Sequence, residues 1–199
     1  MDISSIRRFL PSMIAVVALG VVMLTPGGAD AGNGRPCFGE NPTFVGTPGD
    51  DTTVDGGPGP DVAWLDSGND QYSGRAGNDR ICGGPGRDDL EGNRDNDKLG
   101  GGAHGDTLLG GNGSDLLLGR DGLDQMLGGR GADRLRGGNG RDTLSGNPGP
   151  DRLRGGDGHD ALSGDEGHDF VDGGPGGDVC FTDGNDTLRS CEEVLPAGE

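Results

Sequence analysis

The sequence is poor in aromatic and other large apolar residues. Phe, Trp and Tyr together make up 4% of its 199 residues, and apolar residues of all kinds make up 29%. An ordinary globular core needs more large side chains than this. Low hydrophobicity combined with a formal net charge of -18 is instead typical of disordered chains. Composition alone would therefore predict disorder.

Basic residues are also scarce. The chain has 16 Lys and Arg against 34 Asp and Glu. Binding to a nucleic-acid backbone needs a positive surface, and anionic lipid repels an acidic protein for the same reason. The charge balance therefore argues against both partners and favours cations.

Catalytic and zinc-binding motifs are absent from the sequence. No G-x-S-x-G or H-E-x-x-H occurs, and no cluster of Cys and His has the spacing of a zinc site. The three histidines, His104, His159 and His168, lie in glycine-rich segments without metal-ligand spacing. We expect solvated turn residues there, and no enzyme.

The only long apolar run lies at the N-terminus. Two arginines precede the apolar stretch 9–24, and Ala-Asp-Ala at 29–31 has the pattern of a signal-peptidase site. A membrane anchor is the alternative, but the apolar core 13–24 is short for a bilayer-spanning helix. We therefore expect a signal peptide at 1–31, secretion to the extracellular space, and no membrane span.

The sequence is rich in glycine and has aspartate at a fixed period. Fourteen aspartates stand nine residues apart without interruption, and Asp51 precedes them in an earlier unit. Such regularity indicates one small unit stacked on itself, which places like charges side by side. A column of this kind requires cations. The series consists of Asp61, Asp70, Asp79, Asp88, Asp97, Asp106, Asp115, Asp124, Asp133, Asp142, Asp151, Asp160, Asp169 and Asp178.

The repeated unit is a nonapeptide, G-G-x-G-x-D-x-U-x, in which U is a large apolar residue. Its glycine-rich half is suited to a turn, and its x-U-x half to a short strand whose middle side chain points inward. One inward apolar residue per unit is what a thin solenoid requires. From the second complete unit on, the inward series is Tyr72, Ile81, Leu90, Leu99, Leu108, Leu117, Met126, Leu135, Leu144, Leu153, Leu162 and Val171.

This pattern resembles the hemolysin-type calcium-binding (RTX) family over residues 46–181. The resemblance implies an all-β fold, a right-handed parallel β-roll of about 15 nonapeptide repeats with two repeats per turn. It also implies multiple Ca²⁺ ions between successive turns, held by turn carbonyls and by Asp51 and the fourteen aspartates above. Residues 32–45 and 182–199 would then cap the roll.

All-oxygen ligands in a flexible turn suit calcium better than magnesium, which prefers a tighter octahedron. Two carboxylates about 5 Å apart repel by roughly 1 kcal/mol even in water, and the thin core cannot offset many such pairs. We therefore predict a poorly ordered chain without calcium and a β-roll with it, so that binding energy becomes folding energy. A purely structural role for calcium, with the function elsewhere, is the alternative.

Four cysteines in a secreted chain predict two disulfides. Three pairings are possible, and we favour Cys37–Cys82 with Cys180–Cys191 because this pairing pins both ends of the array. Metal ligation by the cysteines is the alternative.

The repeat departs from its consensus in two places. Asp95 and His104 replace the fourth-position glycine, so we expect the ion sites near Asp97 and Asp106 to be weak or empty. After the last complete unit the register shortens, and Asp186 follows eight residues after the preceding aspartate. We interpret this copy as a cap and its aspartate as a doubtful ligand.

Two sets of outward residues could bind a partner. The ninth position holds Leu109, Leu118 and Leu127 in successive units, and the first and last of these should stack on one face. Arg134 should stack on Arg152, and Arg136 on Arg154, forming a basic stripe with neighbouring arginines. We expect these arginines to pair with nearby aspartates, and an anionic glycan or lipid site is the alternative.

Almost no chain lies outside the repeats, so we expect a calcium-binding structural or interaction module without an effector domain. A calcium-dependent adhesin or scaffold that binds a protein or glycan through these ladders is the second hypothesis.

Overall fold

The computed structural model describes residues 37–196, which form eighteen β-strands. Within this range no helix is long and apolar enough to cross a membrane. The signal peptide expected at 1–31 lies outside the described residues.

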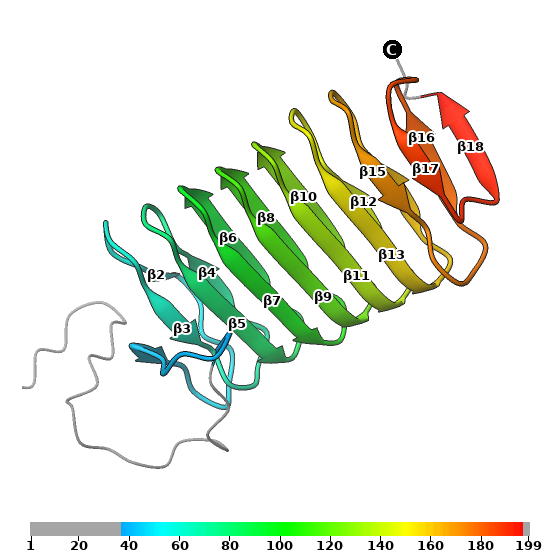
Figure 1. Cartoon of the computed structure of the whole chain (residues 1–199). Helices are drawn as coiled ribbons and strands as arrows, with labels where there is room; N and C mark the ends of the chain where they lie inside the picture. Colours follow the sequence, from blue (N-terminus) through cyan, green and yellow to red (C-terminus); the bar gives the residue numbers. More distant parts are fainter. Residues whose placement is uncertain (1–36, 197–199) are drawn as a thin grey trace, which may run out of the picture.

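The strands form two parallel sheets of nine strands each, stacked along one axis (Figure 1). Successive strands alternate between the sheets, so two nonapeptides complete one turn and the predicted β-roll is confirmed. The odd sheet contains β1 (Phe44–Val45), β3 (Val62–Trp64), β5 (Arg80–Pro85), β7 (Lys98–Ala103), β9 (Leu116–Gly122), β11 (Arg134–Gly140), β13 (Arg152–Gly158), β15 (Phe170–Asp172) and β17 (Thr187–Arg189). The even sheet contains β2 (Val54–Asp55), β4 (Gln71–Ser73), β6 (Asp89–Arg94), β8 (Thr107–Asn112), β10 (Gln125–Arg130), β12 (Thr143–Ser145), β14 (Ala161–Ser163), β16 (Val179–Thr182) and β18 (Glu193–Pro196).

The register between neighbouring strands is a shift of eighteen residues through most of the roll. Leu135 on β11, for example, pairs with Leu117 on β9 and with Leu153 on β13. Because side chains alternate along a strand, this register places every inward residue above another inward residue.

The core is the single column of side chains that the repeat predicted. All twelve residues of the inward series are at most 4% exposed, and they join one continuous cluster. Ala63 and Leu65 extend this cluster toward the N-terminus and Cys180 toward the C-terminus. The core is therefore one side chain thick between the two sheets, which leaves room for only medium-sized residues.

The two disulfides close the ends in different ways. Cys37 bonds to Cys82, which flanks an inward residue on the outer face of β5, and Cys180 bonds to Cys191 at the end of the core. This is the pairing favoured by the sequence. Strands β17 and β18 continue both sheets beyond the last complete nonapeptide.

The predicted ladders on the outer faces are present. Leu109 pairs with Leu127 in the even sheet, while the odd sheet pairs Arg134 with Arg152 and Arg136 with Arg154. Leu118 lies on the odd sheet and takes no part in the leucine ladder.

Candidate metal centre

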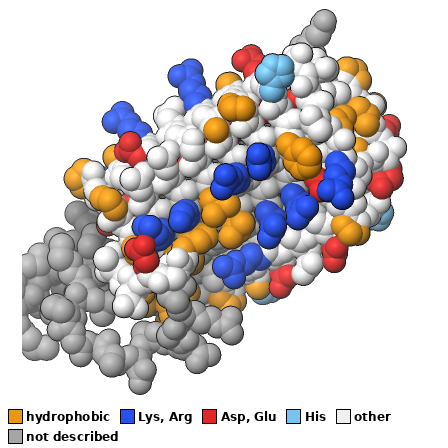
Figure 2. Space-filling model, viewed as in Figure 1, with side chains coloured by type: hydrophobic (Ala, Val, Ile, Leu, Met, Phe, Trp, Pro, Cys, Tyr) orange, Lys and Arg blue, Asp and Glu red, His pale blue; other side chains and the backbone are white. Residues whose placement is uncertain are grey.

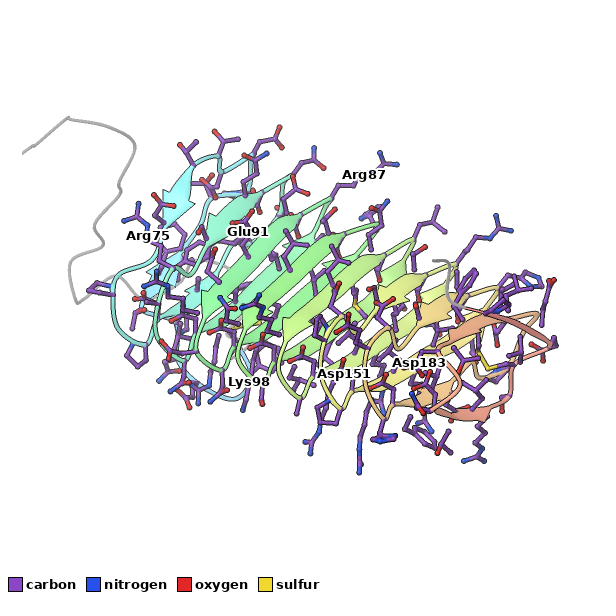
Figure 3. All side chains as sticks on the ribbon, turned by 90° about the horizontal axis from the view of Figure 1, so that it is seen from above. Arg75, Arg87, Glu91, Lys98, Asp151 and Asp183 are labelled. Atoms are coloured by element: carbon purple, nitrogen blue, oxygen red, sulfur yellow. A yellow bond between two sulfur atoms is a disulfide. The ribbon has the colours of Figure 1, made fainter. Side chains whose placement is uncertain are left out.

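The aspartates form two rows, one along each edge of the roll where the chain enters a strand. The row before the odd strands contains Asp61, Asp79, Asp97, Asp115, Asp133, Asp151, Asp169 and Asp186. The row before the even strands contains Asp51, Asp70, Asp88, Asp106, Asp124, Asp142, Asp160 and Asp178. From Asp70 to Asp178 each of these side chains is at most 3% exposed, and Figure 3 shows Asp151 among the strands rather than at the surface.

One carboxylate oxygen of each aspartate, except the first of each row, accepts a hydrogen bond from the preceding turn. The backbone N–H of Asp115 donates to Oδ1 of Asp133 at 2.8 Å, and the N–H of Asp133 donates to Oδ1 of Asp151 at 2.8 Å. The same bond recurs along both rows at 2.7–3.1 Å. These bonds fix the orientation of every carboxylate along the roll axis.

The second oxygen, Oδ2, has no protein partner. Fourteen aspartates, from Asp70 to Asp178 at nine-residue spacing and then Asp186, bury this atom without a hydrogen bond. A buried charged oxygen without a partner is costly, since it has lost its hydration. Such atoms in a regular row require a compensating cation.

The glycine that opens every unit except the one beginning at Leu65 makes room for this oxygen. A Cβ placed on Gly128 would lie 2.6 Å from Oδ2 of Asp133 and 2.8 Å from the carbonyl oxygen of Gly146 in the next turn. A Cβ on Gly56 would meet Asp61 and Gly74 in the same way, at 2.6 and 2.9 Å. A carboxylate and a backbone carbonyl from successive turns therefore converge on the space that a side chain would fill. Oxygen donors of this kind are the ligands that calcium prefers.

The electrostatic setting of the rows disfavours ionised carboxylates in the absence of a cation. Burial and, to a lesser extent, the charges of the neighbouring Asp88 and Asp124 together raise the pKa of Asp106 to about 8, although the hydrogen bond from the backbone N–H of Asp88 acts to lower it. Burial likewise raises the pKa of Asp88 and Asp97 to about 7. A bound divalent cation would reverse this preference, because it stabilises the charged form.

The first aspartate of each row differs from the others. Asp51 and Asp61 are only partly buried, and no aspartate of their row precedes them. Their Oδ2 atoms instead accept hydrogen bonds from the backbone N–H groups of Thr47 and Gly57, at 2.7 and 2.6 Å. At this end the protein itself supplies the donors that the inner aspartates lack.

At the C-terminal end two residues take places in the rows. Asp186 accepts the N–H of Asp169 at 3.1 Å, and Glu192 accepts the N–H of Asp178 at 2.6 Å. Sequence reasoning treated Asp186 as doubtful and missed Glu192, because neither has the nine-residue spacing. The shortened copy Gly184–Leu188 was the available signal for Asp186.

The turns tolerate residues other than glycine in the left-handed region. Asp95 and His104 have φ of 73° and 81°, and Asp97 and Asp106 keep the hydrogen bonds of their rows. The rows therefore pass through this region without a break, and weak ion binding there stays a prediction. Six residues at the second position of the unit also have positive φ: Asp66, Arg75, Asn93, Arg120, Asn147 and Asp165.

Side chains alone do not enclose an ion in the described part of the chain. No three His, Cys, Asp or Glu side chains of residues 37–196 converge on one point. An ion between turns would therefore take its remaining ligands from backbone carbonyls. The three histidines are exposed in the turns and lie outside the rows.

The repeat also matches a known family. Five segments, the last four of which overlap in succession, match the model of the RTX calcium-binding nonapeptide repeat: 45–81, 83–117, 110–144, 118–151 and 145–180. The chain belongs to this family. RTX nonapeptide repeats bind calcium, so this chain carries multiple Ca²⁺ sites, and the rows of buried aspartates agree with them. No curated protein sequence matches the chain.

Proposed function

We propose that the protein is a secreted module that folds when calcium binds and then acts as a structural or interaction element. The observation that carries this proposal is the set of fourteen buried Oδ2 atoms without a partner along the two rows, in a chain of net charge -18. Without ions, the roll would require these carboxyl groups to be protonated and therefore neutral. Calcium removes this requirement and links its own binding to folding.

Each ion would lie between successive turns and take carboxylate oxygens from neighbouring members of one row. The ligands proposed are Asp51 and the fourteen aspartates from Asp61 to Asp178, together with turn carbonyls such as that of Gly146. Calcium accepts six to eight oxygens in flexible geometry, whereas magnesium keeps a strict octahedron and several waters. The proposal assigns no catalytic role to the histidines, which lie exposed and separate from one another.

Secretion is supported by the N-terminal sequence and by the cysteines. Both disulfides persist in an oxidising compartment, and residues 1–31 have the pattern of a signal peptide. Extracellular calcium sites typically have Kd near 10⁻⁴–10⁻³ M, so export to a calcium-rich medium would trigger folding. Mass spectrometry of the exported protein should find Gly32 at its N-terminus. An exported protein that still contains residues 1–31 would contradict cleavage.

Within this proposal, residues 32–45 and 182–199 cap the array. The ring of Phe38 lies over Gly100 on the outer face of the odd sheet, and Arg80 forms an ion pair with Glu40 at 2.9 Å. At the other end, β17 and β18 cover the last complete turn. Caps of this kind protect the open edges of a solenoid.

Circular dichroism of the mature chain, residues 32–199, tests the proposal. We expect little β-structure in chelator, a cooperative gain during a calcium titration, and no comparable gain with magnesium at the same concentrations. A full β-spectrum in chelator at neutral pH, or an equal response to magnesium, would refute calcium-driven folding.

A further inference from the structure

The outward faces of the two sheets differ in charge. The residues that flank the inward column on the even sheet include no Lys or Arg within the described strands, whereas the odd sheet concentrates cations. Figure 2 shows Lys and Arg side chains in rows along one broad face, with apolar side chains between them. The cations at these flanking positions of the odd sheet are Arg80, Lys98, Arg134, Arg136, Arg152, Arg154 and Arg189.

Four of these cations form a block on β11 and β13, in the C-terminal half of the odd face, which we call the arginine block: Arg134, Arg136, Arg152 and Arg154. The register sets Arg134 beside Arg152 and Arg136 beside Arg154, and like charges directly opposite on neighbouring strands destabilise a sheet. All four side chains are exposed. Of these four arginines, only Arg154 has an ion-pair partner among the described residues, Asp172 at 3.2 Å. The aspartates of the rows therefore do not neutralise the block.

Apolar residues border the arginine block along the roll axis. Leu116 and Leu118 lie on β9 before it, and Phe170 lies on β15 after it with 37% of its surface exposed. Together with the block these residues line a shallow groove. A ligand in this groove would therefore meet both positive charge and apolar side chains along the roll axis.

We propose that the arginine block binds a linear acidic polysaccharide, a chain of sugar rings that each carry a carboxylate or sulfate. Guanidinium groups bind such oxyanions through two parallel hydrogen bonds. Neighbouring strands are about 4.8 Å apart, so charge along the roll axis repeats at about the length of one sugar ring. The bordering leucines and Phe170 would contact the C–H faces of the adjoining rings. This inference rests on the proposed function, because the block exists only in the folded roll.

Other anionic partners fit the block less well. An extended acidic peptide presents side chains on one face about 7 Å apart, out of step with the ladder of strands. Nucleic acids and anionic bilayers extend well beyond four arginines and would meet the field of a chain with net charge -18.

Fluorescence anisotropy tests the inference with the calcium-loaded mature protein and a fluorescein-labelled chondroitin sulfate octasaccharide. We expect saturable binding that weakens with salt and disappears in chelator. The quadruple variant R134Q/R136Q/R152Q/R154Q should lose at least tenfold in affinity. A matched control, R87Q/R94Q/R130Q/R141Q, removes the same charge from exposed arginines outside the odd sheet and should stay within twofold. Of these, Arg87 projects away from the roll in Figure 3.

Three results would overturn the inference: no binding by a folded wild-type protein, an equal loss in the control variant, or tighter binding of a glutamate octapeptide or of phosphatidylserine vesicles than of the octasaccharide. Circular dichroism with calcium on each protein separates the two proposals. A wild-type protein that folds with calcium but ignores the octasaccharide refutes only the polysaccharide site. If the quadruple variant does not fold, the double variant R134Q/R136Q should still lose affinity by at least threefold.

Discussion

The middle of the aspartate rows and their N-terminal ends solve the same electrostatic problem differently. In the middle, Asp115 and its neighbours bury an oxygen that no protein group contacts. At the end, Asp51 and Asp61 are partly exposed, and backbone N–H groups of their own turns satisfy the corresponding oxygen.

This difference indicates which part of the roll depends on calcium. The first aspartates are satisfied by hydrogen bonds from their own turns and by solvent, since no aspartate of the rows lies before them. In every later turn the carboxylates pack against another turn. This packing removes water from the carboxylates and places like charges close together. Cation dependence should therefore grow from the first turn toward the middle.

Substituting turn glycines should change the free energy of unfolding most, and the change should differ between the middle of the roll and its N-terminal end. Gly131 and Gly49 both occupy the fourth position of a unit, but a Cβ on Gly131 would collide with the carbonyl of Gly113, whereas a Cβ on Gly49 would meet nothing within 4 Å. We expect Gly131→Ala to lower the free energy of unfolding by about 4 kcal/mol, and Gly49→Ala to change it little. Denaturant unfolding in excess calcium measures both; equal effects would show that turn stacking does not limit the fold.

Substituting the aspartates themselves should give the next largest effect. Asp115→Asn removes a carboxylate shared by successive turns, and loss of one ion at a hundredfold excess of calcium over Kd costs about 3 kcal/mol. Asp51→Asn keeps an acceptor for the N–H of Thr47 and should cost about 1 kcal/mol. Calorimetric ion counts should fall for Asp115→Asn, and an unchanged count would remove this residue from the ligand set.

The pH dependence should reveal competition between protons and calcium in the middle of the rows. Burial raises the pKa of Asp88 and Asp97 to about 7, so the calcium-free roll binds more protons than the unfolded chain. Its stability is then greatest below about pH 4 and falls as the pH rises through these pKa values. We expect the calcium midpoint for folding to rise about tenfold between pH 8 and pH 6. A midpoint independent of pH would contradict the burial of ionisable carboxylates.

Backbone strain in the turns should give the smallest effect. Arg120 has φ of 87°, in the region that favours glycine, whereas Arg130 in the following unit does not have positive φ. We expect Arg120→Gly to raise the free energy of unfolding by about 1 kcal/mol and Arg130→Gly to lower it by about as much. Thermal unfolding in calcium compares the two, and a loss of stability in both would show that the turn holds Arg120 without strain.

Most of the fold could be predicted because the residue types within one nonapeptide specify its local structure. Glycines give the turn, x-U-x gives the strand, and the buried series from Tyr72 to Val171 follows from the alternation of side chains. The pairings of Leu109 with Leu127 and of Arg134 with Arg152 follow from two units per turn.

The ends and the details of the turns were harder to predict. Asp186 and Glu192 enter the rows from a segment whose spacing differs, so periodicity does not reveal them. Arg75 and Arg120 have positive φ at positions where the consensus has glycine. Only the stacking on neighbouring turns shows that the backbone keeps this left-handed conformation when the residue is not glycine. The expected neutralisation of the arginines by aspartates was mostly wrong, because the carboxylates turn into the edges of the roll while the arginines point outward.

By itself the sequence determined the period, the inward column, the family and the need for cations, since these depend on residue types within one nonapeptide. Only the tertiary structure decided that one oxygen of each inner carboxylate bonds to a backbone amide while the other is left without a partner. It also decided that, of the four stacked arginines, only Arg154 has an ion-pair partner among the described residues. Both outcomes depend on groups about eighteen residues apart, which only folding brings into contact.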